Sequence, residues 1–141
     1  MNKYTAWIFV VAVVVSNDIF AANWFYVGES NSGGLAYIDV DSIRNDGRYI
    51  KYWLRIDVKP KKDLDALFEL LTVIRETTQI KASCKTKESK TLSITKETIQ
   101  RGVISDKINE EYSDTVPGSI LDLSIDTACA INSSRNKQRL R

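Results

Sequence analysis

The chain has 141 residues, of which 20 are lysine or arginine and 18 are aspartate or glutamate, so its formal net charge is +2. This charge is too small to indicate nucleic acid as an obligatory partner, and residues of both signs are interspersed. The sequence contains no histidine, which is the usual general base and the commonest zinc ligand. Its absence excludes Ser-His and Cys-His nucleophile pairs, and we expect neither catalysis nor a cofactor.

The first 21 residues have the pattern of a secretory signal peptide. Lys3 supplies a positive charge, and an unbroken apolar run follows over residues 6–15. This run is much shorter than the roughly 20 apolar residues of a membrane-spanning helix, so we expect no membrane span. We predict cleavage after Ala21 and a mature chain that starts at Ala22. Because no cysteine follows the run, we expect no attached lipid at the new N-terminus.

The chain has two cysteines, Cys84 and Cys129. An export signal delivers the chain to an oxidising compartment, where an even number of cysteines indicates a disulfide rather than metal ligands or a redox pair. We therefore predict one bond between Cys84 and Cys129. This bond would fasten the C-terminal segment onto a small β-sheet.

The mature chain opens with two apolar stretches, residues 23–30 and 35–40, separated by a glycine-rich loop. They predict two short strands joined by a turn. Asp46 and Gly47 then favour a hairpin, because this pair tolerates the positive φ of a tight turn. A long strand with two alternating faces follows over residues 48–58. We expect its core face to carry Ile50, Tyr52, Leu54, Ile56 and Val58.

The second face of this strand places Trp53 among charged neighbours: Lys51, Arg55 and Asp57. Trp53 is either a partly exposed contact residue or a side chain covered by another element, and we favour the covered position. Pro60 then ends the strand. The apolar patch of residues 64–71 fits either a helical turn or the lead into the next strand, and the pattern does not decide between them.

Residues 72–84 are rich in β-branched side chains and predict a long strand. Ile80, Ala82 and Cys84 share one of its faces, so we expect Cys84 to point toward the core. A charged turn leads into a further alternating strand over residues 91–99, and residues 103–114 form a last strand or an irregular edge. Short neighbouring strands without β-helix-β alternation predict an antiparallel meander.

The final segment fits two periodicities. Leu121 and Ile125 belong to an alternating strand pattern, but they also share one helical face with Cys129. Ser119 favours the helix, because it is a good N-cap and Asp122 completes a capping-box arrangement. The polar and basic residues 132–141 predict a disordered tail. We therefore expect a single domain over residues 22–131.

Several short motifs together resemble the surface-adhesin protein E family of small exported bacterial proteins. They are a tryptophan-led first strand, the IDVDSIR turn, the KYWLRIDV strand, a central cysteine, VPGSI and a final TAC. The resemblance implies an α+β fold, in which an antiparallel β-sheet of about six strands receives a C-terminal α-helix on its concave face. The resemblance also implies a disulfide that tethers the helix there.

The family's founding adhesin is a surface lipoprotein that binds host matrix and serum proteins, such as vitronectin and laminin, through a lysine-rich segment. The resemblance implies a partner-binding role for the lysines in the matching stretch of this chain: Lys81, Lys85, Lys87, Lys90 and Lys96. This chain lacks the lipid-bearing cysteine of that adhesin. We therefore expect an exported protein with a periplasmic or secreted location, and the cell surface is the alternative.

The function expected from these features is that of a non-enzymatic binding protein, which contacts a protein or an anionic polymer through the lysine-rich turn. The same lysines also fit a solvated hairpin, because charged turns at sheet edges discourage aggregation. One alternative is a periplasmic inhibitor or accessory subunit that holds a partner with a sheet edge or the tryptophan-bearing face. A small hydrolase built on carboxylates is the other alternative.

Asp39 and Asp41 are two residues apart, a spacing that is compatible with paired catalytic carboxylates or with a calcium site. However, Ile43 stands where a calcium loop needs its next oxygen ligand, and Arg44 replaces the loop's glycine. We therefore expect no metal here.

Overall fold

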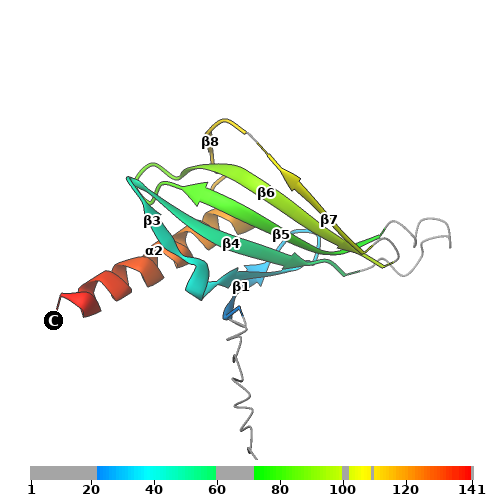
Figure 1. Cartoon of the computed structure of the whole chain (residues 1–141), viewed down its shortest axis with the longest axis horizontal. Coiled ribbons are helices and arrows are strands. Elements are labelled where there is room, and N and C mark those ends of the chain that lie inside the picture. Colours follow the sequence, from blue (N-terminus) through cyan, green and yellow to red (C-terminus); the bar gives the residue numbers. More distant parts are fainter. Residues whose placement is uncertain (1–21, 60–71, 100–101, 109, 141) are drawn as a thin grey trace, which may run out of the picture.

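The computed structural model describes residues 22–59, 72–99, 102–108 and 110–140. The predicted signal peptide and the apolar patch of residues 64–71 lie outside the described residues. Within them, six main antiparallel strands pair in chain order, which confirms the predicted meander (Figure 1). These strands are β1 (Trp24–Glu29), β2 (Leu35–Asp39), β4 (Tyr49–Asp57), β5 (Val73–Ala82), β6 (Glu88–Thr98) and β7 (Gly102–Lys107).

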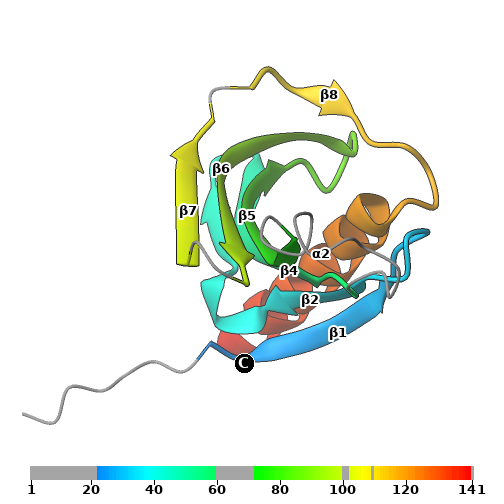
Figure 2. The same ribbon diagram turned by 90° about the vertical axis from the view of Figure 1, so that its right-hand side faces the viewer.

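Four shorter or terminal elements complete the described fold. The two-residue strand β8 (Ser113–Asp114) pairs with β6, and β3 (Arg44–Asp46) pairs with β4. The 3-10 helix η1 (Val40–Ser42) connects β2 to β3, and helix α2 (Ile120–Arg139) follows β8. The sheet is curled, and α2 lies against one of its faces beside β1 and β2 (Figure 2). The α+β class and the C-terminal helix on the sheet are thus as predicted.

The β3–β4 hairpin turns at Gly47, whose φ of +64° lies in the left-handed region that favours glycine. Asp46 pairs with Tyr49 across this turn, as the Asp-Gly signal predicted. In β4 the expected alternation is confirmed, because Ile50, Tyr52 and Leu54 are buried. We call the side of the sheet that carries these three residues the helix face, and the opposite side the open face.

The core lies between the helix face and α2. It contains buried apolar residues from β2, β4, β5 and the helix, and no single element supplies most of it. Gly28 on β1 lies directly beside the helix, because a side chain there would meet Ile120 at 3.4 Å. The buried members of the core are Ala36, Ile38, Ile43, Ile50, Tyr52, Leu54, Ile80, Ala82, Ile125 and Ala128.

Helix α2 begins as predicted, at the N-cap residue Ser119. The Ser119 hydroxyl accepts a hydrogen bond from the backbone N–H of Asp122 at 3.2 Å. The Asp122 carboxylate accepts in turn from the N–H of Gly118 at 3.0 Å rather than from that of the cap residue itself. The N–H of Asp122 is a backbone donor that a helix start leaves unpaired, and the Asp122 carboxylate lies near the positive end of the helix dipole.

The predicted disulfide between Cys84 and Cys129 is present and links the sheet to the helix. The expectation that Cys84 points toward the core is wrong, because this residue is exposed. Strand β5 ends at Ala82, so the alternation of faces does not continue to Cys84. The chain turns at Ser83, and Cys84 meets the helix from the rim of the sheet.

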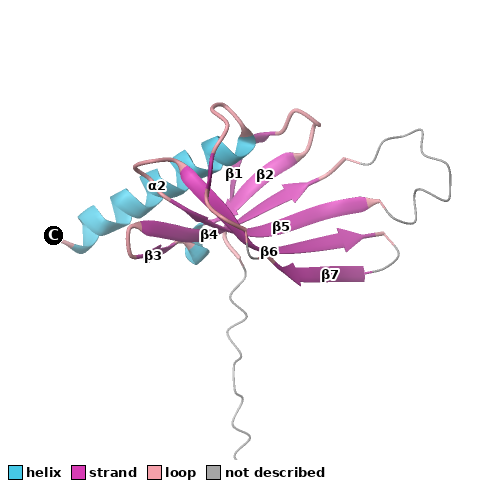
Figure 3. Ribbon diagram, turned by 90° about the horizontal axis from the view of Figure 1, so that it is seen from above, coloured by secondary structure: helices cyan, strands magenta, loops and turns pink. Residues whose placement is uncertain are grey.

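The structure also differs from the prediction of a disordered tail over residues 132–141. Helix α2 continues through Arg139, and its last turns project beyond the sheet (Figure 3). Asn132 donates to Asn45 at 2.8 Å, and Arg135 contacts Asp41 at 3.2 Å. Adding residues to a helix that is already nucleated costs little, so these polar contacts suffice although the segment has no apolar pattern.

Candidate functional site

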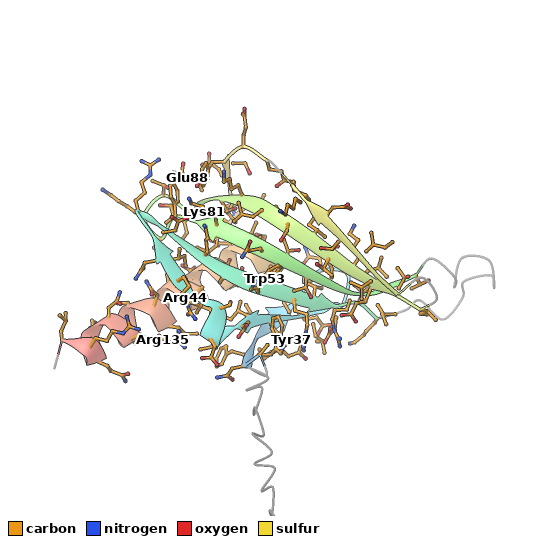
Figure 4. The ribbon with its side chains drawn as sticks, viewed as in Figure 1. Tyr37, Arg44, Trp53, Lys81, Glu88 and Arg135 are labelled. Atoms are coloured by element: carbon orange, nitrogen blue, oxygen red, sulfur yellow. A yellow bond between two sulfur atoms is a disulfide. The ribbon has the colours of Figure 1, made fainter. Side chains whose placement is uncertain are left out.

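One end of the sheet gathers most of the basic side chains singled out in the sequence. We call it the basic end and define it by the tip of the β3–β4 hairpin, residues 46–51, and by the turn between β5 and β6 with the adjoining strand ends, residues 81–90. Figure 4 shows Lys81 and Glu88 at this end, away from Trp53 and Tyr37. Arg48 of the hairpin and Lys85 of the turn line a common cavity of about 420 Å³, together with Glu88, which pairs with Arg48 at 3.7 Å.

The turn between β5 and β6 is held by hydrogen bonds within it. The Ser83 hydroxyl accepts from the backbone N–H groups of Lys85, at 3.3 Å, and Thr86, at 3.1 Å. The N–H of Lys87 donates to the Ser83 carbonyl at 3.0 Å, and Lys87 adopts a positive φ of 63°. The adjacent disulfide fixes the turn to α2, so Lys85 is presented from a constrained backbone.

Three lysines form a row on the open face. The sheet register places Lys51 opposite Lys81, and Lys81 opposite Lys90. Asp46 accepts from Lys51 at 2.9 Å and from Lys81 at 2.7 Å. The hydrogen bond from Lys81, followed by that from Lys51, lowers the pKa of Asp46 to about 2. This carboxylate is therefore ionised at any physiological pH and offsets part of the positive charge of the row.

Two tyrosines lie beside this row. The rings of Tyr49 and Tyr112 stack with centroids 4.6 Å apart. The Lys81 ammonium lies 5.2 Å from the centroid of Tyr49, and that of Lys90 lies 4.8 Å from the centroid of Tyr112. These cation–π contacts hold both ammonium groups close to the aromatic surface.

Lys87 has a different role, because its side chain turns toward the helix. Its ammonium contacts Asp122 at 3.4 Å and forms a close ion pair with Asp126. The hydrogen bond to Asp126 is the main cause of the raised pKa of Lys87. Lys87 therefore links the β5–β6 turn to the first turns of α2 beside the disulfide.

The five predicted lysines are only partly brought together. Lys81 and Lys90 are neighbours on the open face, and Lys85 is exposed in the turn. Lys96 lies opposite Glu76 in the sheet register. Glu76 is an odd number of positions from Lys81 along β5, and successive residues of a strand point to opposite faces. Glu76 and Lys96 therefore lie on the helix face. Lys96 and Glu76 also approach within 3.6 Å. The structure thus separates Lys96 from the basic end.

Two cationic residues of the basic end, Arg48 and Lys51, are not among the five predicted lysines. Arg48 directly follows the Asp46-Gly47 hairpin signal, which placed it at a hairpin tip. Lys51 lies on the face of the long strand opposite the core, which the alternation already indicated. What the chain order could not show is that the hairpin tip lies beside the β5–β6 turn.

A second surface on the open face is aromatic. The Arg55 guanidinium lies 4.5 Å from the ring centroid of Trp24 and 4.6 Å from that of Tyr37. The ring of Tyr26 meets that of Tyr37 edge to face at 5.6 Å. Arg55 also pairs with Asp57 at 3.3 Å, while its buried Nε has no hydrogen-bond partner. Trp53, on the same face, is half-buried.

Asp39 and Asp41 have separate partners. Asp39 is the N-cap of η1, where its carboxylate accepts from the N–H groups of Asn23 and Asp41. Asp41 points its carboxylate toward Arg135. Within the described residues there is no group of three or more acidic or cysteine side chains able to hold a metal ion. In the same part of the chain, no helix is long and apolar enough to cross a membrane.

The chain matches a known protein family over most of its length. No curated protein and no solved structure matches the chain. Residues 24–130 match the family described as surface-adhesin protein E, and this range contains the six main strands, the disulfide and the buried part of α2. The match covers well over half of the chain and agrees with the resemblance seen in its motifs. The chain belongs to the surface-adhesin protein E family.

Proposed function

We propose that this protein is an exported, non-enzymatic binding protein that contacts an acidic extracellular partner through its basic end. The observation that carries the proposal is the cavity of about 420 Å³ into which two constrained turns bring Arg48 and Lys85, with Glu88 offsetting part of the charge of Arg48. Family membership supports the adhesin role. By analogy with the founding adhesin, a host matrix or serum protein is the partner class to test first.

Export is supported by the disulfide, because such bonds persist in oxidising compartments. We propose that residues 1–21 are removed on export and that the mature protein is periplasmic or secreted, with display on the cell surface as the alternative. The exposed position of Cys84 is compatible with a bond that forms after translocation.

Within the basic end we assign different weights to the predicted lysines. We expect Lys85 to contribute most to partner binding, because it is exposed and its ammonium has no acidic partner among the described residues. Lys81 and Lys90 extend the positive surface, although Asp46 offsets part of their charge. Lys87 supports the turn through its aspartate pairs, and Lys96 contributes only to partners that reach the helix face.

The test is a double charge reversal, Arg48→Glu with Lys85→Glu, measured by surface plasmon resonance on immobilised vitronectin and laminin. Exposed charges are screened beyond about 8 Å at physiological salt, so binding should weaken as salt is added. Charge complementarity acts mainly on association, so the double variant should associate at least about tenfold more slowly. Lys87 is left unchanged because its reversal would place a third acid beside Asp122 and Asp126.

The matched control reverses two lysines remote from the cavity, Lys107→Glu with Lys137→Glu, and changes the net charge equally. It should bind as the unmodified protein does. If both double variants lose binding to the same extent, the interaction depends on net charge alone and the basic end is not the site. Unchanged binding by the Arg48→Glu, Lys85→Glu variant with a normal melting temperature contradicts the proposal.

A second candidate function uses the aromatic surface of Trp24, Tyr26, Tyr37 and Arg55 to hold one protein partner, as an inhibitor or accessory subunit would. It is favoured by the exposure of Tyr26, which is 52 % exposed, and by the unpaired Nε of Arg55. Aromatic side chains and arginine are enriched where protein interfaces derive their affinity. A partner captured by the protein but not by a Tyr26→Ala variant would support this function.

A further inference from the structure

A second basic cavity lies at the opposite side of the β3–β4 hairpin from the Lys85 turn. It has a volume of about 340 Å³ and is formed where the last turns of α2 pass the start of β3. Figure 4 shows Arg44 and Arg135 projecting from these two elements near each other. The cavity is lined by Ile43, Arg44, Asn45, Asn132, Arg135, Asn136 and Arg139. Its volume falls within the roughly 300–1,000 Å³ that is common for small-ligand sites.

The positive charge of this cavity is only partly compensated. Asp41 contacts Arg135 at 3.2 Å. The Arg44 guanidinium donates to the backbone carbonyl of its neighbour Ile43 at 2.8 Å, and a carbonyl carries no formal charge. Among the described residues, neither Arg44 nor Arg139 has a carboxylate partner. The basic end differs in this respect, since Lys51, Lys81 and Lys87 face an aspartate and Lys90 faces a ring.

The lining is suited to an oxyanion. A guanidinium presents its N–H groups in a planar fork that matches two oxygens of a sulfate, phosphate or carboxylate group. Side-chain amides add neutral donors, and two of the three in this cavity, Asn45 and Asn136, are exposed. The Asn132–Asn45 hydrogen bond ties the helix to β3 and so keeps the two arginine-bearing elements in place.

We propose that this cavity binds a sulfate or phosphate oxyanion through Arg44, Arg135 and Arg139. The site goes beyond the proposed function, because it shares no residue with the Arg48–Lys85 cavity and uses the part of α2 that follows the family match at residue 130. The oxyanion is either free in solution or carried by a sulfated polysaccharide. Both present the same group to the cavity.

Basic residues in the last turn of a helix also stabilise it by offsetting the negative end of the helix dipole. Lys137 and Arg139 both lie in this turn, but only Arg139 lines the cavity. Lys137→Gln therefore removes the same formal charge from the same turn without changing the lining. It is the matched control for Arg139→Gln.

The experiment titrates the full mature chain, with its disulfide intact, with sodium sulfate in one arm and a heparin-derived tetrasaccharide in the other. Sodium chloride holds the ionic strength constant, and NMR follows the arginine side-chain N–H signals. We expect saturable shifts at Arg44, Arg135 and Arg139. Because a charge-assisted hydrogen bond to an oxyanion is strong, Arg139→Gln and Arg44→Gln should each weaken binding at least about tenfold. Lys137→Gln should change it less than about twofold.

Saturation with sulfate supports a site for the free ion, whereas saturation with the tetrasaccharide alone supports the polymer as the source. The absence of saturable shifts in both arms overturns the proposal, as does equal weakening by Lys137→Gln and Arg139→Gln. The Arg48→Glu, Lys85→Glu variant should retain sulfate binding. Its result separates this site from the proposed function, since either can fail while the other holds.

Discussion

The hydroxyl of Tyr52 lies buried at the junction of the sheet and helix α2. It is 2.8 Å from the hydroxyl of Ser124, which is also buried. Ser124 donates its own proton to the Leu121 carbonyl at 2.7 Å, so Tyr52 is the donor in the bond between the two side chains. Burial raises the pKa of Tyr52 and keeps the hydroxyl protonated. This bond joins two buried hydroxyls, one from β4 and one from α2.

Replacing either hydroxyl should destabilise the fold, but by different amounts. Tyr52→Phe removes one hydrogen bond, and we expect a cost of about 0.5–1.5 kcal/mol. Ser124→Ala leaves the Tyr52 hydroxyl buried without an acceptor, and we expect about 1–3 kcal/mol. Urea unfolding of both single variants and of the double variant gives the coupling free energy between the two hydroxyls. A double variant whose cost equals the sum of the two single costs would contradict a direct interaction.

Asp46 allows a residue-scale test of the lysine row. Its pKa is lowered to about 2 chiefly by Lys81, then by Lys51. A carboxyl whose folded pKa lies below its unfolded pKa stabilises the fold above about pH 4, and this contribution is lost as the pH falls toward the folded pKa.

We expect the carboxyl carbon of Asp46 to titrate near 2 by NMR and to move upward toward 3.8 in a Lys81→Met variant. Lys107→Met, on the exposed strand β7, is the control and should leave the midpoint unchanged. A midpoint near 3.8 in the unmodified protein would mean that Asp46 does not bridge the two lysines.

At the scale of elements, several kinds of contact attach helix α2 to the sheet. Ile125 and Ala128 are buried against the core, Tyr52 bonds to the helix, and the disulfide ties Cys129 to the β5–β6 turn. The ion pair of Lys87 with Asp126 adds a contact close to the disulfide. The helix therefore closes the core and also fixes the turn that carries Lys85.

Removing the disulfide should destabilise the protein without changing its fold. The bond closes a separation of 45 residues, for which the chain-entropy model gives a stabilisation of roughly 4 kcal/mol. The Cys84→Ser, Cys129→Ser variant should show this loss in urea unfolding measured beside the oxidised protein. A loss below about 1 kcal/mol would indicate that the reduced unfolded chain keeps the turn and the helix together.

At the scale of the molecule, the chain divides into a body that holds the core and a helical extension. The family match ends at residue 130, and the last core-packing residue of the helix is Ile131. Beyond it, α2 is held by Asn132 and Arg135 at its surface. The extension therefore contributes to the Arg44 cavity more than to the stability of the fold.

A chain truncated after Ile131 should fold, form its disulfide and lose no more than about 1 kcal/mol of unfolding free energy, because surface polar contacts contribute little. It should also lose the oxyanion response of the Arg44 cavity and keep binding at the basic end. Circular dichroism and urea unfolding test the first expectation. Failure of the truncated chain to fold would place the extension within the structural domain.

Local patterns in the sequence were sufficient for most of the elements, but not for the end of α2, where the polar pattern predicted disorder. The alternation from Ile50 to Leu54 predicted the buried face of β4, and Ser119 predicted the start of α2, because these signals depend on residues within one strand or one turn. Because the chain has two cysteines and was expected to be exported, only one disulfide pairing was possible. The family motifs added the order of strands and the place of the helix.

Only the tertiary structure decided how the charges are distributed. Lys87 and Asp126 are 39 positions apart, and their pairing depends on where the curled sheet brings the β5–β6 turn to the helix. The same holds for Asp46 between Lys51 and Lys81, and for Arg44 beside Arg135. A run of lysines in the sequence specifies the number of positive charges. Whether a lysine meets an aspartate or solvent is a property of elements that are distant in the chain and adjacent in space.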